Sequence, residues 1–243
     1  MAFCYKQLIH LRAMLGELEQ KNLLPAQAKV SDDFGTIETA TNILAKQSKI
    51  EVPPFQSIQI GERSAFLVKR FDRVMGKRVA YQSADTLLEK GYSETLSYVD
   101  FVEQLASVSA KPDQDCAELF RRIAFNLLVR NIDDHLRNHG IILTPLGWRL
   151  TPVFDINADA VHKVLSTPII NGGEQENRTF FELFEARDYF RLTAQQAIDI
   201  AKQVEKSTRN WADILRQQGI EPEALPYYAA AFENPNRNLI KDL

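Results

Sequence analysis

The feature that most constrains this chain is a dense polar segment, NIDDHLRNHGIIL, which covers residues 131–143. Residues 116–130, which precede it, place their apolar side chains on one helical face and predict a buried helix. After it, the short β-prone runs GIIL and WRL are joined by the turn-forming residues TPLG and predict a hairpin. The second run continues into PVFDIN, which contains Asp155. The hairpin would return Asp155 to the loop that carries Asp133 and Asn138.

The N-terminal part of the sequence predicts a small mixed lobe. Leucines recur at helical spacing in residues 8–18, and a second helical pattern covers residues 36–49 and stops at VPP. The runs SIQI and SAFLVKRF, separated by GER, then predict a strand pair. Most of the remaining chain is predicted to be helical, and Thr193 begins a capping box for a long helix. We therefore expect an α+β protein with lobes at residues 1–71 and 72–243.

Composition gives no support to several other classes of protein, although it does not exclude a nucleic-acid partner. The 243 residues are 45% hydrophobic, which is enough to bury a substantial core. The formal charge is −3, and no window collects the Lys and Arg cluster typical of a nucleic-acid binder. Cys4 and Cys116 fit no disulfide framework, and no stretch approaches the ~20 apolar residues of a membrane span. We expect a soluble, cytoplasmic protein, with no evident direct binding to nucleic acid or membrane.

The polar segment has the residues that phosphoryl transfer needs. A kinase catalytic loop supplies an Asp that orients the attacking hydroxyl, an Asn five positions later, and a second Asp beyond a hairpin for Mg²⁺. Asp133 and Asn138 have this spacing, and Asp155 stands where the second Asp belongs. The dipeptide before Asp133 is Asn-Ile rather than His-Arg, and the tripeptide centred on Asp155 is Phe-Asp-Ile rather than Asp-Phe-Gly. Turn chemistry is the alternative, since loops are rich in Asp and Asn.

Three segments together resemble the HipA-like serine/threonine kinases, which are toxins of bacterial type II toxin–antitoxin systems. These segments are FLVKRFDR, FNLLVRNIDDHLRNHGIIL and GWRLTPVFDIN, and a looser similarity runs from about Ala28 to Phe232. The resemblance implies a protein-kinase-like bilobal fold with a reduced N-terminal lobe and a mostly helical C-terminal lobe. It also implies an ATP- and Mg²⁺-dependent kinase in which Asp133 is the catalytic base and Asn138 and Asp155 hold Mg²⁺.

The resemblance further implies a nucleotide site beside the second predicted strand. The segment that contains Lys69, Phe71 and Asp72 would be the hinge against which adenine lies, largely through backbone contacts. Asp72 is the best candidate there for a role of its side chain. The alternative for Asp72 is an ordinary ion pair with Arg70 or Arg73.

Two more residues match the family, but the phosphate loop does not. Lys29 matches the phosphate-binding strand lysine and Glu38 the helix glutamate; the alternatives are an exposed lysine and an acidic residue in a first helical turn. Only Gly16 among the residues before Lys29 is a glycine, so no Gly-rich segment is available to wrap the phosphates. The chain would then be a shortened kinase, one subunit of a split kinase whose missing N-terminal subdomain is a separate chain, or an inactive binding module.

The two histidines of the polar segment offer a competing enzyme class. His135 and His139 would share one face of a helix, as in zinc sites, and nearby carboxylates would suit a metal-dependent phosphoesterase. The segment follows a helix end and precedes a strand, so we expect instead that His135 braces the catalytic loop beside the nucleotide and that His139 is structural. For the kinase, the resemblance implies an aminoacyl-tRNA synthetase as the protein substrate and a small DNA-binding antitoxin as the partner.

Overall fold

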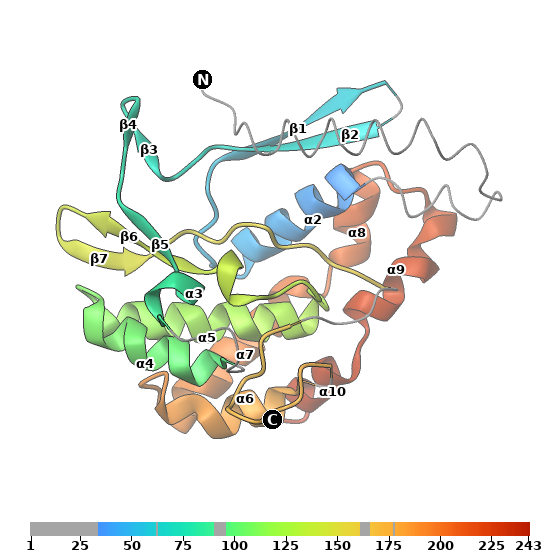
Figure 1. The fold of residues 1–243 in the computed structure, drawn as a ribbon. Coiled ribbons are helices and arrows are strands. Elements are labelled where there is room, and N and C mark those ends of the chain that lie inside the picture. Colours follow the sequence, from blue (N-terminus) through green and yellow to red (C-terminus); the bar gives the residue numbers. More distant parts are fainter. Residues whose placement is uncertain (1–33, 62, 90–95, 161–165, 177) are drawn as a thin grey trace.

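The computed structural model describes residues 34–61, 63–89, 96–160, 166–176 and 178–243 (Figure 1). The predicted candidates Lys29 and Gly16, and the helix predicted over residues 8–18, lie outside these ranges. Within them, no helix is both long enough and apolar enough to cross a membrane.

The first described elements are a helix and a strand pair. Helix α2 (Phe34–Gln47) and the antiparallel strands β1 (Phe55–Ile60) and β2 (Arg63–Val68) confirm the predicted helix and strand pair. Helix α2 lies along the strand pair (Figure 1), and Gly35 allows the contact. A Cβ on Gly35 would lie 2.0 Å from the backbone oxygen of Ser64, so any other residue would push the helix away from β2.

The other strands are short, and the predicted hairpin is among them. Strands β6 (Gly140–Thr144) and β7 (Gly147–Leu150) pair antiparallel, which confirms the hairpin that follows the polar segment. Strand β5 (Tyr81–Ser83) adds to the free edge of β6, giving the order β5-β6-β7, and β3 (Arg73–Val74) pairs with β4 (Lys77–Arg78). The sequence did not predict β3, β4 or β5, since runs of two or three mostly polar residues carry no periodicity.

The remainder of the described chain is mostly helical, which confirms the α+β class. The helices are α3 (Ala84–Leu87), α4 (Tyr98–Val108), α5 (Pro112–Leu128), α6 (Phe180–Glu185), α7 (Ala194–Thr208), α8 (Trp211–Gln217), α9 (Leu225–Phe232) and α10 (Pro235–Lys241), with 3₁₀ turns at Leu136–Asn138, Ala186–Asp188 and Pro222–Ala224. Thr193 begins α7 with the predicted capping box, and Ser97 and Thr179 begin α4 and α6 in the same way.

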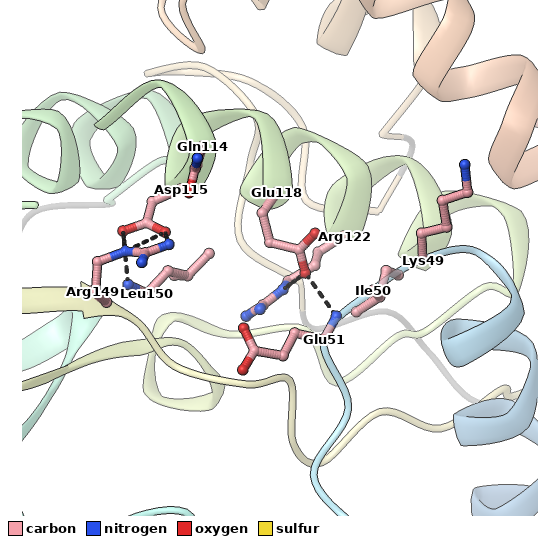
Figure 2. Close-up of a pocket in the computed structure, with 9 residues that line it drawn as sticks. All are labelled: Lys49, Ile50, Glu51, Gln114, Asp115, Glu118, Arg122, Arg149 and Leu150. Atoms are coloured by element: carbon pink, nitrogen blue, oxygen red, sulfur yellow. Dashed lines mark hydrogen bonds and ion pairs between the residues drawn. The ribbon is translucent and has the colours of Figure 1, made fainter. Parts of the chain in front are cut away.

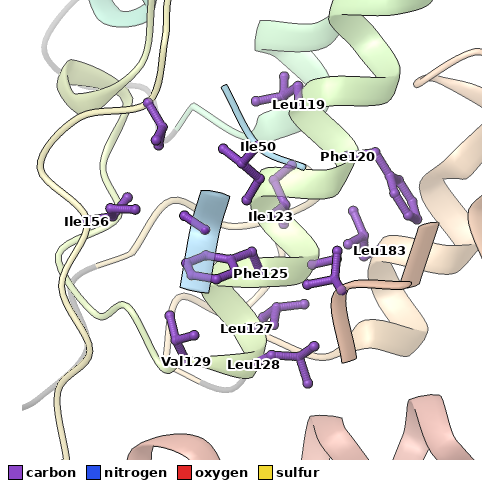
Figure 3. Close-up of a cluster of buried hydrophobic side chains, with 14 of the residues drawn as sticks. Ile50, Leu119, Phe120, Ile123, Phe125, Leu127, Leu128, Val129, Ile156 and Leu183 are labelled. Carbon is purple, nitrogen blue, oxygen red and sulfur yellow. The ribbon is translucent and has the colours of Figure 1, made fainter. Parts of the chain in front are cut away.

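Helix α5 is the centre of the hydrophobic core. Its fully buried residues include Leu119, Phe120 and Ile123, and Figure 3 shows side chains from other parts of the chain gathered around it. One continuous cluster includes Ile37 of α2 and Ile240 of α10. The N-terminal elements thus share a core with the last helix, and the predicted lobe boundary between residues 71 and 72 stays a prediction.

The C-terminal end of α5 is closed by a side chain from far along the chain. The Nδ2 group of Asn234 donates to the backbone oxygens of Leu127 and Leu128 at 3.0 and 3.1 Å. These oxygens belong to the last turn of α5, where carbonyl groups have no partner within the helix. Asn234 therefore supplies the missing donor just before the polar segment begins.

Candidate active site

The polar segment leaves α5 through a reversal of the backbone. Arg130 has a φ of 50°, and the amide of Asn131 donates to the oxygen of Asn126 at 2.9 Å. Two residues later, the Asp133 side chain is 69% exposed. His135 lies beside it, with Nε2 3.6 Å from Oδ1 of Asp133. An exposed carboxylate on a loop held at both ends is accessible to a substrate hydroxyl.

The side chain of Asn138 is oriented by the backbone of Asp133. Its Nδ2 group donates to the backbone oxygen of Asp133 at 3.0 Å, and its side chain is buried. The hydrogen bond engages the amide nitrogen, so the amide oxygen is the atom left to bind a cation. The same bond ties the two ends of the loop together, because it joins Asp133 to the 3₁₀ turn at Leu136–Asn138.

Asp155 occupies an uncommon backbone conformation beyond the hairpin. Its φ is 57°, in the left-handed region that Asp tolerates better than most residues do. Hydrogen bonds hold the chain on both sides of it: the amide of Val153 donates to the oxygen of Glu51 at 2.8 Å, and the amide of Ala158 donates to Oγ1 of Thr41 at 3.2 Å. The surrounding structure therefore fixes an exposed carboxylate in a strained conformation, which is common at functional sites.

Glu38 of α2 lies close to Asp155. Burial and, second, the charge of Asp155 raise the pKa of Glu38 to about 8. A cation bound between these two carboxylates would stabilise both in their charged form, which each otherwise disfavours in the other. Asp155 and the amide oxygen of Asn138 are both oxygen donors, and this ligand chemistry fits Mg²⁺ and suits zinc poorly.

Aromatic contacts bring the predicted hinge to the Asp155 segment. The ring of Phe71 lies 5.6 Å from that of Phe154 and 6.0 Å from that of Tyr81, measured between centroids. Phe71 and Phe154 directly precede Asp72 and Asp155 in the chain. The two segments that the resemblance assigns to adenine and to metal are therefore in contact through side chains.

The Asp72 side chain itself is engaged in ion pairs. Arg70 binds both of its carboxylate oxygens, at 2.7 and 2.5 Å, and Arg73 lies 2.5 Å from one of them. The hydrogen bond from Arg70 is the main cause that holds the pKa of Asp72 below its usual range. The Lys69 side chain is exposed, and its amide donates to the oxygen of Pro54. In this state the side chain of Asp72 orders the hinge, and its predicted contact with nucleotide stays a prediction.

Behind the exposed loop lies a buried polar network that the sequence analysis missed. Asp134, directly after Asp133, is 1% exposed and accepts hydrogen bonds from Arg178 at 2.8 Å and from His139 at 2.9 Å. The Tyr98 hydroxyl lies 2.9 Å from the same nitrogen of His139. Burial alone would raise the pKa of Asp134, but the Arg178 charge and the His139 hydrogen bond lower it more, to well below the usual range. Asp134 is therefore a charged, fully paired carboxylate.

The network also holds the backbone of the catalytic loop. Arg178 donates to the oxygen of Asn131 at 3.3 Å, and the Ser166 hydroxyl donates to the oxygen of Ile132 at 3.0 Å. The amide of Thr167 donates to the oxygen of Asp134 at 2.8 Å. The backbone oxygens of Asn131, Ile132 and Asp134, on either side of Asp133, thus have partners more than thirty positions away, a separation at which no local sequence pattern could indicate contact.

The two histidines have different surroundings. His139 makes ring hydrogen bonds that hold the loop, and it is structural as predicted. The bracing role of His135 beside the nucleotide stays a prediction. His135 has a buried Nδ1 with no partner among the described residues, and its contact is the exposed Asp133. The segment between them is a 3₁₀ turn rather than an α-helix, so the helical zinc arrangement does not form. In the described parts of the chain, no group of three His, Cys, Asp or Glu residues is placed to hold a metal.

The fold, with small sheets beside a mostly helical part and a hairpin between the two acidic segments, is a kinase-like fold. Within that class, the chain belongs to the HipA-like C-terminal domain family, whose model matches residues 16–212. This match confirms the resemblance that the three sequence segments carried.

Solved structures and a curated relative agree with the family. The chain is similar to HipA of Shewanella oneidensis MR-1, solved in a toxin–antitoxin complex with HipB and operator DNA, with a TM-score of 0.66, 17% identity and coverage of 87% of this chain and 58% of that one. It is also similar to the Helicobacter pylori proinflammatory kinase CtkA, with a TM-score of 0.53, 10% identity and coverage of 86% and 88%. A Sinorhizobium fredii protein named "Putative kinase Y4mE" is 26% identical over an alignment of 152 residues, with coverage of 54% of this chain and 34% of that protein.

Two limits follow from these numbers. At 17% and 10% identity, the structural matches show the fold. The chain spans about a third of the curated relative and 58% of the HipA chain, so the activities of the whole relatives are not carried over by the match itself.

Proposed function

We propose that this protein transfers the γ-phosphoryl group of ATP to a serine or threonine hydroxyl of another protein. The observation that carries the proposal is the bond from Asn138 Nδ2 to the backbone oxygen of Asp133, because it sets a hydroxyl-orienting carboxylate and a cation-binding amide oxygen in one fixed loop. Family membership supports the same reaction class.

In this proposal the exposed carboxylate of Asp133 orients the substrate hydroxyl and accepts its proton. His135, 3.6 Å from Asp133, contributes a polar neighbour that limits how the carboxylate can turn. Asn138 and Asp155 would hold Mg²⁺, with Glu38 close to Asp155. The bound ion would neutralise charge on the ATP phosphates.

The nucleotide would lie against the hinge. We assign adenine to the backbone of Lys69 through Asp72, beside the ring of Phe71, because the Phe71–Phe154 contact brings this segment to Asp155. Lys29 would bind a phosphate and pair with Glu38, as the family resemblance implies. An ion pair with Lys29 would also favour the charged form of Glu38, which the neighbouring Asp155 disfavours.

The substrate and partner follow from the family alone. We propose an aminoacyl-tRNA synthetase as the phosphorylated protein and a small DNA-binding antitoxin as the partner, in a cytoplasmic toxin–antitoxin system. The HipA structure to which this chain is similar was solved with HipB and operator DNA, which supports a partner of this kind.

A transfer assay tests the reaction. The purified chain is incubated with γ-labelled ATP and purified aminoacyl-tRNA synthetases, in Mg²⁺ or in EDTA, and labelled residues are identified by mass spectrometry. We expect label on serine or threonine in Mg²⁺ only. If ATP binds but no label is transferred to any protein, including the chain itself, the binding-module alternative replaces the kinase.

A further inference from the structure

A second pocket lies between the first turns of α5, strand β7 and the connection that follows α2 (Figure 2). Its volume is about 340 Å³, and it contains none of the proposed active-site residues. Its lining is mostly charged: Lys49, Ile50, Glu51, Gln114, Asp115, Glu118, Arg122, Arg149 and Leu150. Side chains with so many charges need partners, so the first question is which of them already have one.

Two of the acidic residues in this pocket are satisfied within the protein. Asp115 accepts a two-point contact from Arg149, with Nη2 at 2.8 Å and Nε at 2.9 Å, and it also accepts the amide of Leu150. Glu118 accepts from Nε of Arg122 at 2.9 Å and from the amide of Glu51 at 3.1 Å. Neither carboxylate therefore needs a ligand.

Arg122 is not satisfied. It is 1% exposed, and its Nη2 group is buried with no hydrogen-bond partner among the described residues. A guanidinium carries its positive charge on all three nitrogens, and the bond from Nε to Glu118 leaves the buried Nη2 without an acceptor among the described residues. Figure 2 shows its guanidinium directed toward the space that the Glu51 side chain also enters. An unpaired buried donor of this kind indicates an absent acceptor.

Three residues at the opening could complete a ligand site. Lys49 and Glu51 are exposed, and Gln114 offers an amide on α5. After the hydrogen-bonded pairs are set aside, the pocket retains positive groups on Arg122 and Lys49 and one carboxylate, that of Glu51, whose charge also acts on Arg149. A doubly charged phosphate would have to lie beside three carboxylates in this pocket, which disfavours it. A ligand with one carboxylate and one ammonium matches both signs.

We propose that this pocket binds a small zwitterion, a free amino acid or a compound of that kind, with its carboxylate on Arg122 and Lys49 and its ammonium on Glu51. The volume exceeds that of one amino acid, so a side chain can be accommodated beside Ile50 and Leu150. This proposal does not depend on the kinase reaction, because binding is measured directly.

The test is calorimetry and thermal unfolding of the full chain with each standard free amino acid at millimolar concentration. Acetate and methylammonium each carry only one of the two charged groups, and the N-acetyl derivative of the tightest-binding amino acid lacks the ammonium. Inorganic phosphate tests for a different anion. We expect at least one amino acid to bind and to raise the unfolding temperature. Binding of phosphate in place of any amino acid, or no binding by any probe, would overturn the proposal and leave a water-filled pocket.

Variants at the opening locate the site even if Arg122→Gln fails to fold. Glu51→Gln should weaken amino-acid binding by about tenfold, the usual effect of losing one charged hydrogen bond, while Lys49→Gln should weaken it less because Arg122 remains. Glu103→Gln, at an exposed residue of α4, is the matched control and should bind as the wild type does. Equal affinity of Glu51→Gln and wild type, or equal affinity for the N-acetyl derivative and the free amino acid, contradicts the assignment of the ammonium to Glu51.

Discussion

Asp133 and Asp134 are neighbours in the chain, yet they lie in opposite environments. The Asp133 side chain is 69% exposed, whereas Asp134 is 1% exposed and paired with Arg178 and His139. The exposed region, with Asp133 and Asp155, can meet a substrate. The buried region, with Asp134 and its partners, cannot, and it holds the loop backbone instead.

Asp133 is therefore available for chemistry, whereas Asp134 supports the loop. The sequence alone does not distinguish these two adjacent carboxylates. A buried charge is tolerated only when it is paired, and removal of one partner leaves the other unpaired. An exposed carboxylate has no such dependence. The same Asp-to-Asn substitution should therefore remove activity at one position and stability at the next.

The largest expected effect is on activity. Asp133→Asn is nearly isosteric and removes the charge that orients the hydroxyl, so phosphoryl transfer should fall by about 10²–10⁴-fold. The free energy of unfolding should stay within about 0.5 kcal/mol of the wild type, since the side chain is exposed. Transfer assays and urea unfolding measure the two quantities. Full activity in this variant would remove Asp133 from the proposed role.

The substitution Asp134→Asn should lower the free energy of unfolding, which Asp133→Asn should leave almost unchanged. Asp134→Asn leaves the Arg178 guanidinium buried without its counter-charge and should cost about 3–5 kcal/mol of unfolding free energy, measured in urea. Asp133→Asn is the matched control. A loss under about 1 kcal/mol would mean that water reaches Arg178 and that the buried region supports the loop less than its geometry indicates.

The pH dependence of stability tests the same difference between Asp133 and Asp134. Because the folded pKa of Asp134 is lowered, its carboxylate stays charged where the unfolded chain, with an ordinary pKa of about 3.9, takes up a proton. The stabilisation is therefore present at neutral pH and is lost as the pH falls below about 4. Unfolding free energies at a series of acidic pH values should fall less steeply in Asp134→Asn than in the wild type. Parallel curves would show that other carboxylates cause the acid sensitivity.

A smaller effect is expected at Asp155. Asp155→Asn keeps a side chain that tolerates the left-handed backbone but removes the charge, so nucleotide affinity in Mg²⁺ should fall at least about tenfold while affinity in EDTA changes little. Calorimetry in the two buffers makes the measurement. Equal losses in both buffers would place Asp155 with the supporting residues.

The smallest effect should come from Glu38, which is neither fully exposed nor fully buried. Its pKa of about 8 in the folded chain exceeds the ordinary value of 4.5, so the folded chain keeps a proton that the unfolded chain releases between these values. In EDTA, the unfolding free energy should decline as the pH rises through this window, and the decline should be smaller in Glu38→Gln. A steeper decline in the variant would contradict the direction of the shift.

Local patterns predicted the parts of the site that are close together in sequence. The apolar face of α5, the spacing of Asp133 and Asn138, and the hairpin before Asp155 each depend on a few neighbouring residues, and each element was found where it was expected. These patterns also predicted the fold class.

Local sequence patterns could not predict the contacts that hold the site together. Arg178 contacts Asp134 from 44 positions away, and Phe71 contacts Phe154 from 83 positions away, so neither pair leaves a periodic or motif-like pattern in the sequence. The hydrogen bonds of His139 with Asp134 and Tyr98 likewise depend on the fold and could not be predicted from the sequence. Short strands such as β5 form only because a partner strand is already present.

The cap that Asn234 places on the last turn of α5 has a consequence for synthesis of the protein. The chain emerges from the ribosome from its N-terminus, so residues 131–139 are exposed long before Asn234 can close the helix that leads into them. We expect ribosome-bound chains that stop short of Asn234 to be cut by protease within this loop, and released full-length chains to resist. The loop that carries Asp133 would then gain its protection only once Asn234 had been made.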